Sequence, residues 1–317
     1  MKGGENIMRE NYFPFTFFEG KFVKTEEAKI SVMTNALQYG TAVFGGIRGY
    51  YNKKKGAIFL FRIEDHYKRL LNSLKILGVS LNYSLEKLKE ITIELVKRNK
   101  PKTDIYLRPF AYAGSLQLSP NLARDKIFDF FIYMIPLAEY LSVDKGLRVM
   151  VSSWLRIPDT AIPARGKIAG AYINSALAKK EATDRGFDEA IFLTQDGHVC
   201  EGSGENLFIV RDNTLITPPA SEEILEGITR NTVISLAKDL KLKVVERKID
   251  KSELYLAQEA FFTGTAVQIA WIKEIDGRII GNGKRGKITK KLQELFFEIV
   301  RGNNKKYSPK WCTKVKI

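Results

Sequence analysis

The chain has 317 residues, 44% hydrophobic and 27% charged, and a formal net charge of +15. This composition excludes a disordered chain and suffices for two ordinary domains, each with its own core. Two cysteines and two histidines provide neither a disulfide framework nor the spacing of a zinc site, so we expect no metal. No apolar run reaches the roughly 18 residues that span a bilayer, and the first ten residues lack a signal-peptide core, so we expect a cytoplasmic protein without membrane contact.

Strands and helices are mixed in the first part of the chain, which we assign to a small domain of residues 1–138. The expected strands are 17–23, 28–32, a hairpin over 47–61 that turns at Asn52–Gly56, 103–114 and 126–139. The expected helices are one that begins at Thr34 and runs into a glycine break, then 64–77, and 85–99 with Ser84 as its N-cap. The polar stretch 139–146 is the expected interdomain connection.

The second part, 147–317, is expected to form a larger domain. Its expected strands lie within 146–153, 189–202, 206–219, 241–249 and 259–280. Its expected helices are one that follows Lys167 and runs to Gly186, then 228–240, a short one with a capping box from Asp250 to Glu253, and 287–300. Because strands and helices do not alternate regularly, the sequence predicts an α+β fold and not a doubly wound sheet.

The positive charge is concentrated toward the end of the chain. From Lys284 onward there are eleven basic residues and two glutamates, which give +9 of the total of +15. Apolar residues in 287–300 recur at helical spacing, so the basic residues are expected on the opposite, solvated face. No nucleic-acid-binding signature is present and we expect no nucleic-acid partner, although a basic nucleic-acid-binding protein is the alternative from another functional class.

The segment ARGKIAGAY, residues 164–172, places Lys167 among glycines and alanines. Small neighbours let a large molecule approach the backbone. Lys167, followed five residues later by Tyr172, is therefore a candidate tether for a bound cofactor. A solvated lysine near a helix start is the alternative.

Two further segments suit a flat, anionic ligand. In CEGSGENLF, residues 200–208, glycines follow Glu201 and leave room for a ring whose nitrogen the carboxylate meets; a glycine hairpin with a solvated glutamate is the alternative. In LEGITRNTV, the N–H groups of Ile228 and Thr229 at a helix start form a candidate anion site, with ordinary capping as the alternative.

Two more segments offer donors to a phosphate. FFTGTAVQI, residues 261–269, has hydroxyls and free amides at a strand end, where a simple turn is the alternative. Arg69 is either an arginine that reaches solvent from a core-facing helix or a phosphate clamp. A tethering lysine, a carboxylate for a ring nitrogen and several phosphate donors are together what pyridoxal 5′-phosphate (PLP) needs.

Several motifs, in one order along the chain, resemble the branched-chain amino-acid aminotransferases, which are class IV PLP enzymes of fold type IV. The motifs are YGTAVFGGIRGY (39–50), YLRP (106–109), SSWLRIPDTAIPARGKIAGAY (152–172), EGSGENLF (201–208), GITR (227–230) and GTA (264–266). The resemblance runs from Phe15 to the closing YSPKWCTKV. It implies a two-domain α+β fold like that of D-amino-acid aminotransferase, with PLP in the interdomain cleft.

The resemblance also implies roles for individual residues. Lys167 would hold the cofactor covalently, Glu201 would pair with the pyridine nitrogen, and Tyr172 would lie beside the phenolic oxygen. The implied phosphate ligands are Arg69, Ile228, Thr229 and Thr265. The implied substrate-binding residues are Tyr39, Phe44, Gly46, Tyr106, Arg108, Tyr140, Thr265 and Ala266. Among these, Tyr106 and the amides of Thr265 and Ala266 would bind the α-carboxylate, and Arg108 the distal carboxylate of glutamate.

The implied reaction is ping-pong transamination of leucine, isoleucine and valine with 2-oxoglutarate, in a homodimer or higher oligomer. Gly45 stands where the family commonly has Glu, and Leu137 where some members have Trp. Both differences remove bulk or charge near the implied pocket and favour a broader substrate range. A class IV transaminase for D-amino acids, aromatic L-amino acids or (R)-amines is the alternative.

Overall fold

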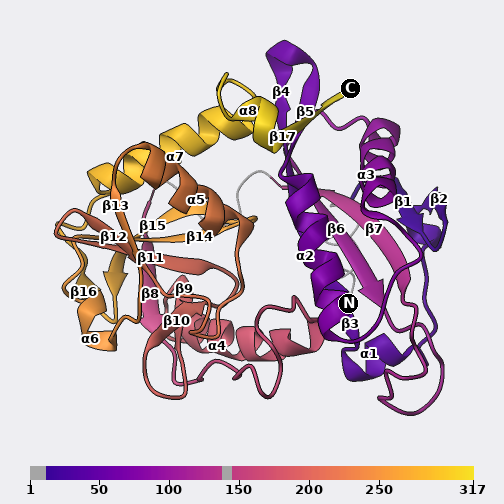
Figure 1. Ribbon diagram of the computed structural model, residues 1–317, viewed down its shortest axis with the longest axis horizontal. Helices are drawn as coiled ribbons and strands as arrows, with labels where there is room; N and C mark the ends of the chain where they lie inside the picture. The colour runs from indigo at the N-terminus through magenta and orange to yellow at the C-terminus, as the bar shows by residue number, and fades with distance from the viewer. Residues whose placement is uncertain (1–11, 138–144) are drawn as a thin grey trace, which may run out of the picture. The chain divides into compact units, whose positions relative to one another are not determined.

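The computed structural model describes residues 12–137 and 145–317 (Figure 1). The chain divides into two compact units, Met1–Ala138 with Ile299–Ile317, and Glu139–Glu298. Residues 299–317 were expected in the second domain, but they belong to the first unit because their strand pairs with the first sheet. The expected connection, 139–146, lies outside the described residues except for its last two.

The first unit is built on an antiparallel sheet with the strand order β17-β5-β4-β6-β7-β1-β2, in which β3 also pairs with β6. Its strands are β1 (Phe15–Phe18), β2 (Lys21–Lys24), β3 (Ala42–Phe44), β4 (Ile47–Asn52), β5 (Ala57–Phe61), β6 (Ile105–Tyr112), β7 (Asp129–Pro136) and β17 (Cys312–Lys316). Its α-helices are α1 (Asn35–Tyr39), α2 (Ile63–Ile76), α3 (Leu85–Asn99) and α8 (Ser308–Trp311). Of two short 3-10 turns, η1 (Thr25–Glu27) follows β2 and η2 (Lys53–Lys55) joins the neighbouring strands β4 and β5.

Local signals in the sequence account for most of these elements. The β4–β5 hairpin turns where predicted, because the Asn52 side chain accepts the Lys55 N–H and Gly56 takes a left-handed conformation. Helix α3 begins as predicted at Ser84, whose hydroxyl accepts the Lys87 N–H at 3.2 Å. The strand expected at 28–32 is wrong: that segment pairs with no other strand and leaves Val32 80% exposed.

The second unit has a nine-stranded mixed sheet with the order β10-β9-β8-β15-β14-β11-β12-β13, in which β16 pairs with β15. Its strands are β8 (Leu147–Val151), β9 (Glu189–Leu193), β10 (Val199–Gly202), β11 (Asn206–Arg211), β12 (Thr214–Thr217), β13 (Lys243–Glu246), β14 (Glu259–Gly264), β15 (Gln268–Ile275) and β16 (Arg278–Ile279). The central strands bury one face in a common core that includes Val149, Ile191, Leu207 and Phe262. Both sheets fit the predicted α+β class.

The remaining helices are η3 (Ala169–Ala171), α4 (Tyr172–Asp184), α5 (Ile228–Asp239), α6 (Lys251–Leu254) and α7 (Lys287–Val300). The capping box expected at α6 does not form: Asp250 makes no side-chain cap, and Glu253 instead binds Arg211 and Arg247. Helix α7 buries Leu292 and Phe296 and exposes its lysines, as predicted. In the described part of the chain no helix combines the length and apolarity that crossing a membrane requires.

Candidate active site

Lys167 lies in the loop that leads through η3 into α4, and its side chain is half-buried. Its Nζ is 2.5 Å from the hydroxyl oxygen of Tyr172, the first residue of α4. An amine held beside a phenol is positioned by the protein and does not move freely in solvent. Lys167 and Tyr172 of the segment ARGKIAGAY are therefore in contact at the start of a helix, only five residues apart in the chain.

Glu201, at the end of β10, is a buried carboxylate held by three donors. Its Oε1 is 2.9 Å from Nη2 of Arg156, while its Oε2 accepts the Asn206 amide and the Leu225 N–H, each at 3.0 Å. Burial raises the pKa of Glu201, whereas Arg156, the Leu225 N–H and the charge of Lys167 act in the opposite direction. The structure thus brings a positively charged lysine close enough to influence Glu201 electrostatically.

The start of α5 lies beside the same carboxylate, because Asn206 joins the two. The Asn206 amide donates to the Leu225 carbonyl at 2.8 Å, two residues before the N-cap Gly227. Gly227 provides no side-chain cap, and a Cβ there would lie 1.9 Å from Oδ1 of Asn206. Helix α5 therefore begins without a side-chain cap, with Thr229 buried in its first turn, and the positive end of its dipole favours an anion.

The turn after β14 completes this group of residues. Thr263 lies directly opposite Asn206 in the β11–β14 ladder, so the two side chains are on the same face of the sheet. The Thr263 hydroxyl is buried and has no hydrogen-bond partner in the described residues. Thr265 and Ala266, which follow in the turn to β15, are half-buried. The Thr263 hydroxyl can therefore still form a hydrogen bond, on the same face of the sheet as Asn206, which contacts the segment before α5.

A second buried carboxylate, Glu205, lies in the turn between β10 and β11. Its Oε2 accepts the Gly204 N–H at 3.0 Å. Burial, and repulsion from the buried Glu189, raise the pKa of Glu205 to about 8. Glu189 is itself paired with Lys179, Nζ to Oε2, at 2.8 Å. A pKa of about 8 keeps Glu205 mostly in its neutral form at neutral pH.

The remaining predicted residues belong to the first unit. Tyr106 and Arg108 are two residues apart in β6 and therefore face the same side of that strand. The Arg108 guanidinium carbon lies 4.5 Å from the ring centre of Phe44 and 5.2 Å from that of Tyr106. Gly46 allows the Tyr106 hydroxyl to approach the backbone, because a Cβ at Gly46 would lie 2.1 Å from that oxygen.

Three other predicted site residues have different outcomes, and Gly45 can also be placed. Tyr39, at the end of α1, is 37% exposed, and Arg69 is half-buried on α2. Tyr140 lies outside the described residues. Gly45 packs against Pro109, whose Cγ would be 2.8 Å from a Cβ at position 45. The structure therefore gathers one set of predicted residues in each unit.

Arg156 and Asn206 are the residues that sequence reasoning did not assign. Both occur within motifs quoted above, but Arg156 is one of many basic residues and nothing in its local sequence marks it as buried. Asn206 follows the glycines after Glu201, and an amide directly after a buried carboxylate was the available signal. Only the structure, in which both side chains contact Glu201, shows that Arg156 and Asn206 belong to this group.

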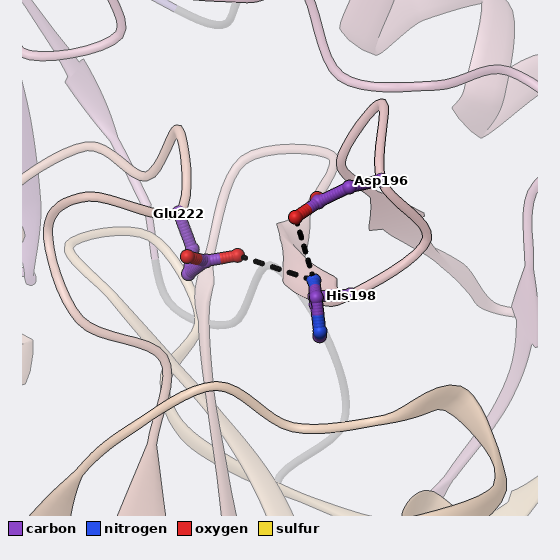
Figure 2. A group of neighbouring side chains, drawn as sticks. All are labelled: Asp196, His198 and Glu222. Carbon is purple, nitrogen blue, oxygen red and sulfur yellow. Dashed lines mark ion pairs between the residues drawn. The ribbon is translucent and has the colours of Figure 1, made fainter.

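A separate group of titratable side chains, Asp196, His198 and Glu222, has the spacing to hold a metal ion (Figure 2). The His198 Nδ1 is 2.9 Å from the Asp196 carboxylate and 4.0 Å from that of Glu222. The Lys248 ammonium already bridges these carboxylates, at 2.9 Å from Asp196 and 3.3 Å from Glu222. We interpret the group as an ion-pair network that joins the β9–β10 turn to the segment before α5.

Comparison with known proteins identifies the family. The model of the amino-transferase class IV family matches residues 42–275. A probable branched-chain-amino-acid aminotransferase of Aquifex aeolicus is 51% identical, over 95% of this chain and 96% of that protein. The crystal structure of a branched-chain aminotransferase of Thermoproteus uzoniensis with norvaline has a TM-score of 0.91 at 45% identity and covers 96% of this chain and 99% of its own.

A second crystal structure is informative about ligands. It is a branched-chain amino acid aminotransferase of the organism abbreviated T.th., complexed with N-(5′-phosphopyridoxyl)-L-glutamate, with a TM-score of 0.90 at 40% identity over 95% of this chain and 98% of its own. The relative and both solved structures cover at least 95% of the chain, and the family model covers residues 42–275 within it. The chain therefore belongs to the class IV aminotransferases and, within them, to the branched-chain-amino-acid aminotransferases.

Proposed function

We propose that this protein transfers the amino group of branched-chain L-amino acids to 2-oxoglutarate, with PLP held by Lys167. The observation that carries the proposal is the group formed in the second unit by the Lys167–Tyr172 pair and the buried, ion-paired Glu201. The relatives with the same name, one of them solved with a phosphopyridoxyl-glutamate compound, support it.

The residues present suit PLP. A primary amine is the group that joins the aldehyde carbon, and a phenol beside it suits an anionic ring oxygen. A carboxylate paired with arginine can remain ionised in a buried site and accept a hydrogen bond from a ring nitrogen. An uncapped helix start with neighbouring hydroxyls suits the phosphate. When bound, the cofactor supplies a conjugated ring that accepts the electron pair left at the substrate Cα.

The chain's own groups would perform the remaining steps. With the cofactor bound, Lys167 Nζ would take the proton from the substrate Cα and would later give it back. The hydroxyl oxygen of Tyr172 is 2.5 Å from that amine and would orient it. The same hydroxyl group would donate a hydrogen bond to the ring oxygen of PLP. Glu201 would stabilise the positive charge of a protonated ring nitrogen. In the second unit, Ile228, Thr229 and Thr265 would bind the phosphate.

The first unit would bind substrate. Phe44 and Tyr39 suit an aliphatic side chain, while the hydroxyl group of Tyr106 suits the α-carboxylate. Arg108 suits the second carboxylate of glutamate, because its guanidinium is held over two rings and its Nε has no hydrogen-bond partner in the described residues. One site would thus accept an apolar and an anionic side chain in turn.

Exposed apolar side chains in the first unit support the proposed homodimer or higher oligomer. Leu37 and Leu118 are 62% and 84% exposed, and Val32 is 80% exposed. Asn35 connects their segments, since its amide donates to carbonyls of Gln117 and Ser119 at 2.9 and 2.8 Å. Apolar side chains gathered in this way are typical of an interface between subunits.

The test is a visible spectrum of the protein with PLP, before and after L-leucine, without any acceptor. We expect a yellow band that L-leucine bleaches, and no steady turnover by the Lys167→Ala variant. A yellow band that responds only to D-alanine or an (R)-amine would assign the alternative substrate class. Steady turnover by Lys167→Ala would contradict the assignment of Lys167.

A further inference from the structure

The hydrogen bonds around Glu201 leave a defined place for one more donor. An ionised carboxylate has about four lone-pair positions. Two on Oε2 are used by the Asn206 amide and the Leu225 N–H, and one on Oε1 faces Arg156. The remaining position is on Oε1, the oxygen that Arg156 holds.

Arg156 is itself fixed from several directions. Its side chain is 11% exposed, its Nε donates to the Glu223 carbonyl at 3.3 Å, and its guanidinium carbon lies 5.6 Å from the Phe192 ring centre. Its backbone N–H donates to the Leu193 carbonyl at 2.8 Å. A guanidinium held by such contacts sets the position and orientation of the carboxylate that it touches.

We propose that Arg156 is a positioning residue for Glu201, which holds Oε1 as an ionised acceptor aimed at the ring nitrogen of PLP. The inference rests on the proposed function, because the ring nitrogen is the fourth donor. Arg156 touches neither substrate nor cofactor in this arrangement and acts through Glu201 alone.

Buried Glu201 needs a positive counter-charge to remain ionised, and Arg156 supplies one. Burial favours the neutral form of a carboxyl group, and the two neutral donors on Oε2 do not supply a counter-charge. The charges of Lys167 and Arg230 also favour the ionised form of Glu201, but Arg156 has the largest effect of the three. Loss of Arg156 would therefore shift Glu201 toward its protonated form, which competes with the ring nitrogen instead of stabilising its protonated form. Loss of Arg156 should therefore change the protonation of the bound cofactor, beyond any effect on folding.

The experiment measures the nitrogen-15 NMR signal of ring-labelled PLP bound to each variant, and the dissociation constant of PLP. In the unsubstituted protein we expect a protonated ring nitrogen at neutral pH. In Arg156→Met we expect a neutral ring nitrogen at the same pH and at least a tenfold weaker affinity for PLP. Arg156→Lys, which keeps the charge, should restore most of the protonated signal. Arg211→Met, which removes a different arginine–carboxylate pair at the far end of β11, is the matched control and should change neither measurement.

A double-mutant cycle separates positioning from a general structural role. If Arg156 acts through Glu201, adding Arg156→Met to Glu201→Gln should weaken PLP binding less than twofold further. A protonated ring nitrogen in Arg156→Met, or losses that multiply in the double variant, would overturn the proposal. Absence of any PLP binding by the unsubstituted protein would instead overturn the proposed function, and the role of Arg156 with it.

Discussion

The Arg108 guanidinium lies over two aromatic rings in the first unit, and its Nε lacks a hydrogen-bond partner among the described residues. A half-buried cation with an unused donor gains from an anionic ligand but contributes little to the binding of an aliphatic one. We therefore expect Arg108→Ala to slow the half-reaction with L-glutamate far more than the half-reaction with L-leucine. Single-turnover rates with each amino acid provide the measurement. Equal losses on both substrates would argue against the role, and Arg108→Lys should recover part of the glutamate rate.

Glu205 makes stability depend on pH in a direction opposite to an ordinary paired carboxylate. Burial and Glu189 raise its pKa to about 8, whereas an unfolded glutamate titrates near pH ~4.3. Between these values the folded protein holds a proton that the unfolded chain has released, so stability falls as pH rises through this window. Above pH 8 the stability of the folded protein stays lower than it is at acidic pH.

We expect Glu205→Gln, which is neutral throughout, to remove that part of the slope. Calorimetric melting temperatures of the cofactor-free protein at pH 5 and pH 9 check this. Glu94→Gln, at an exposed carboxylate paired with Arg98, is the control and should run parallel to the unsubstituted protein. A Glu205→Gln profile parallel to both would contradict the prediction.

At the scale of elements, the start of α5 depends on a glycine for reasons of space. Gly227 has φ −71° and ψ 134°, which any residue adopts, so the requirement comes from the 1.9 Å between an added Cβ and Oδ1 of Asn206. We expect Gly227→Ala to displace Asn206 from Glu201, to destabilise the protein by about 1–3 kcal/mol and to weaken PLP binding. Denaturant unfolding and a PLP titration measure the two effects.

Gly204→Ala is the steric control for stability, because its Cβ would meet no atom within 4 Å. It should unfold at nearly the same denaturant concentration as the unsubstituted protein. If Gly227→Ala also unfolds at the denaturant concentration of the unsubstituted protein and binds PLP normally, the position of Asn206 does not require a glycine at 227.

The sequence predicts these elements well but predicts their contacts poorly. Alternating and helical patterns placed β6, β7, α2 and α3 correctly, since each buries its own apolar face. Residues 28–32 have the composition of a strand, yet no neighbouring strand pairs with them. The capping box at α6 fails for a similar reason. Arg247, six residues away, and Arg211, 42 residues away, bind Glu253 more strongly than a local N–H does. Arg156 was missed because only the fold reveals its carboxylate partner.

At the scale of the whole molecule, binding of PLP should raise the melting temperature by mass action. A ligand that binds only the folded protein adds about 2.7 kcal/mol at one hundred times its dissociation constant. We expect a shift of several degrees with PLP and a much smaller one with pyridoxal, which lacks the phosphate that α5 and its neighbours would bind. Differential scanning calorimetry with each compound measures this. Equal shifts would indicate that the start of α5 does not bind the phosphate.

The pairing of β17 with β5 has a consequence for synthesis of the protein. Strand β5 ends at Phe61, but its neighbour on one side, β17, begins only at Cys312. The ribosome therefore synthesises residues 139–298, the whole second unit, before β17 exists to pair with β5. During translation the nascent chain carries an open strand edge for some 250 residues, the interval between these two strands. The first unit to begin emerging is thus the last to finish folding, and chaperone engagement is expected to concentrate on β5 in that interval.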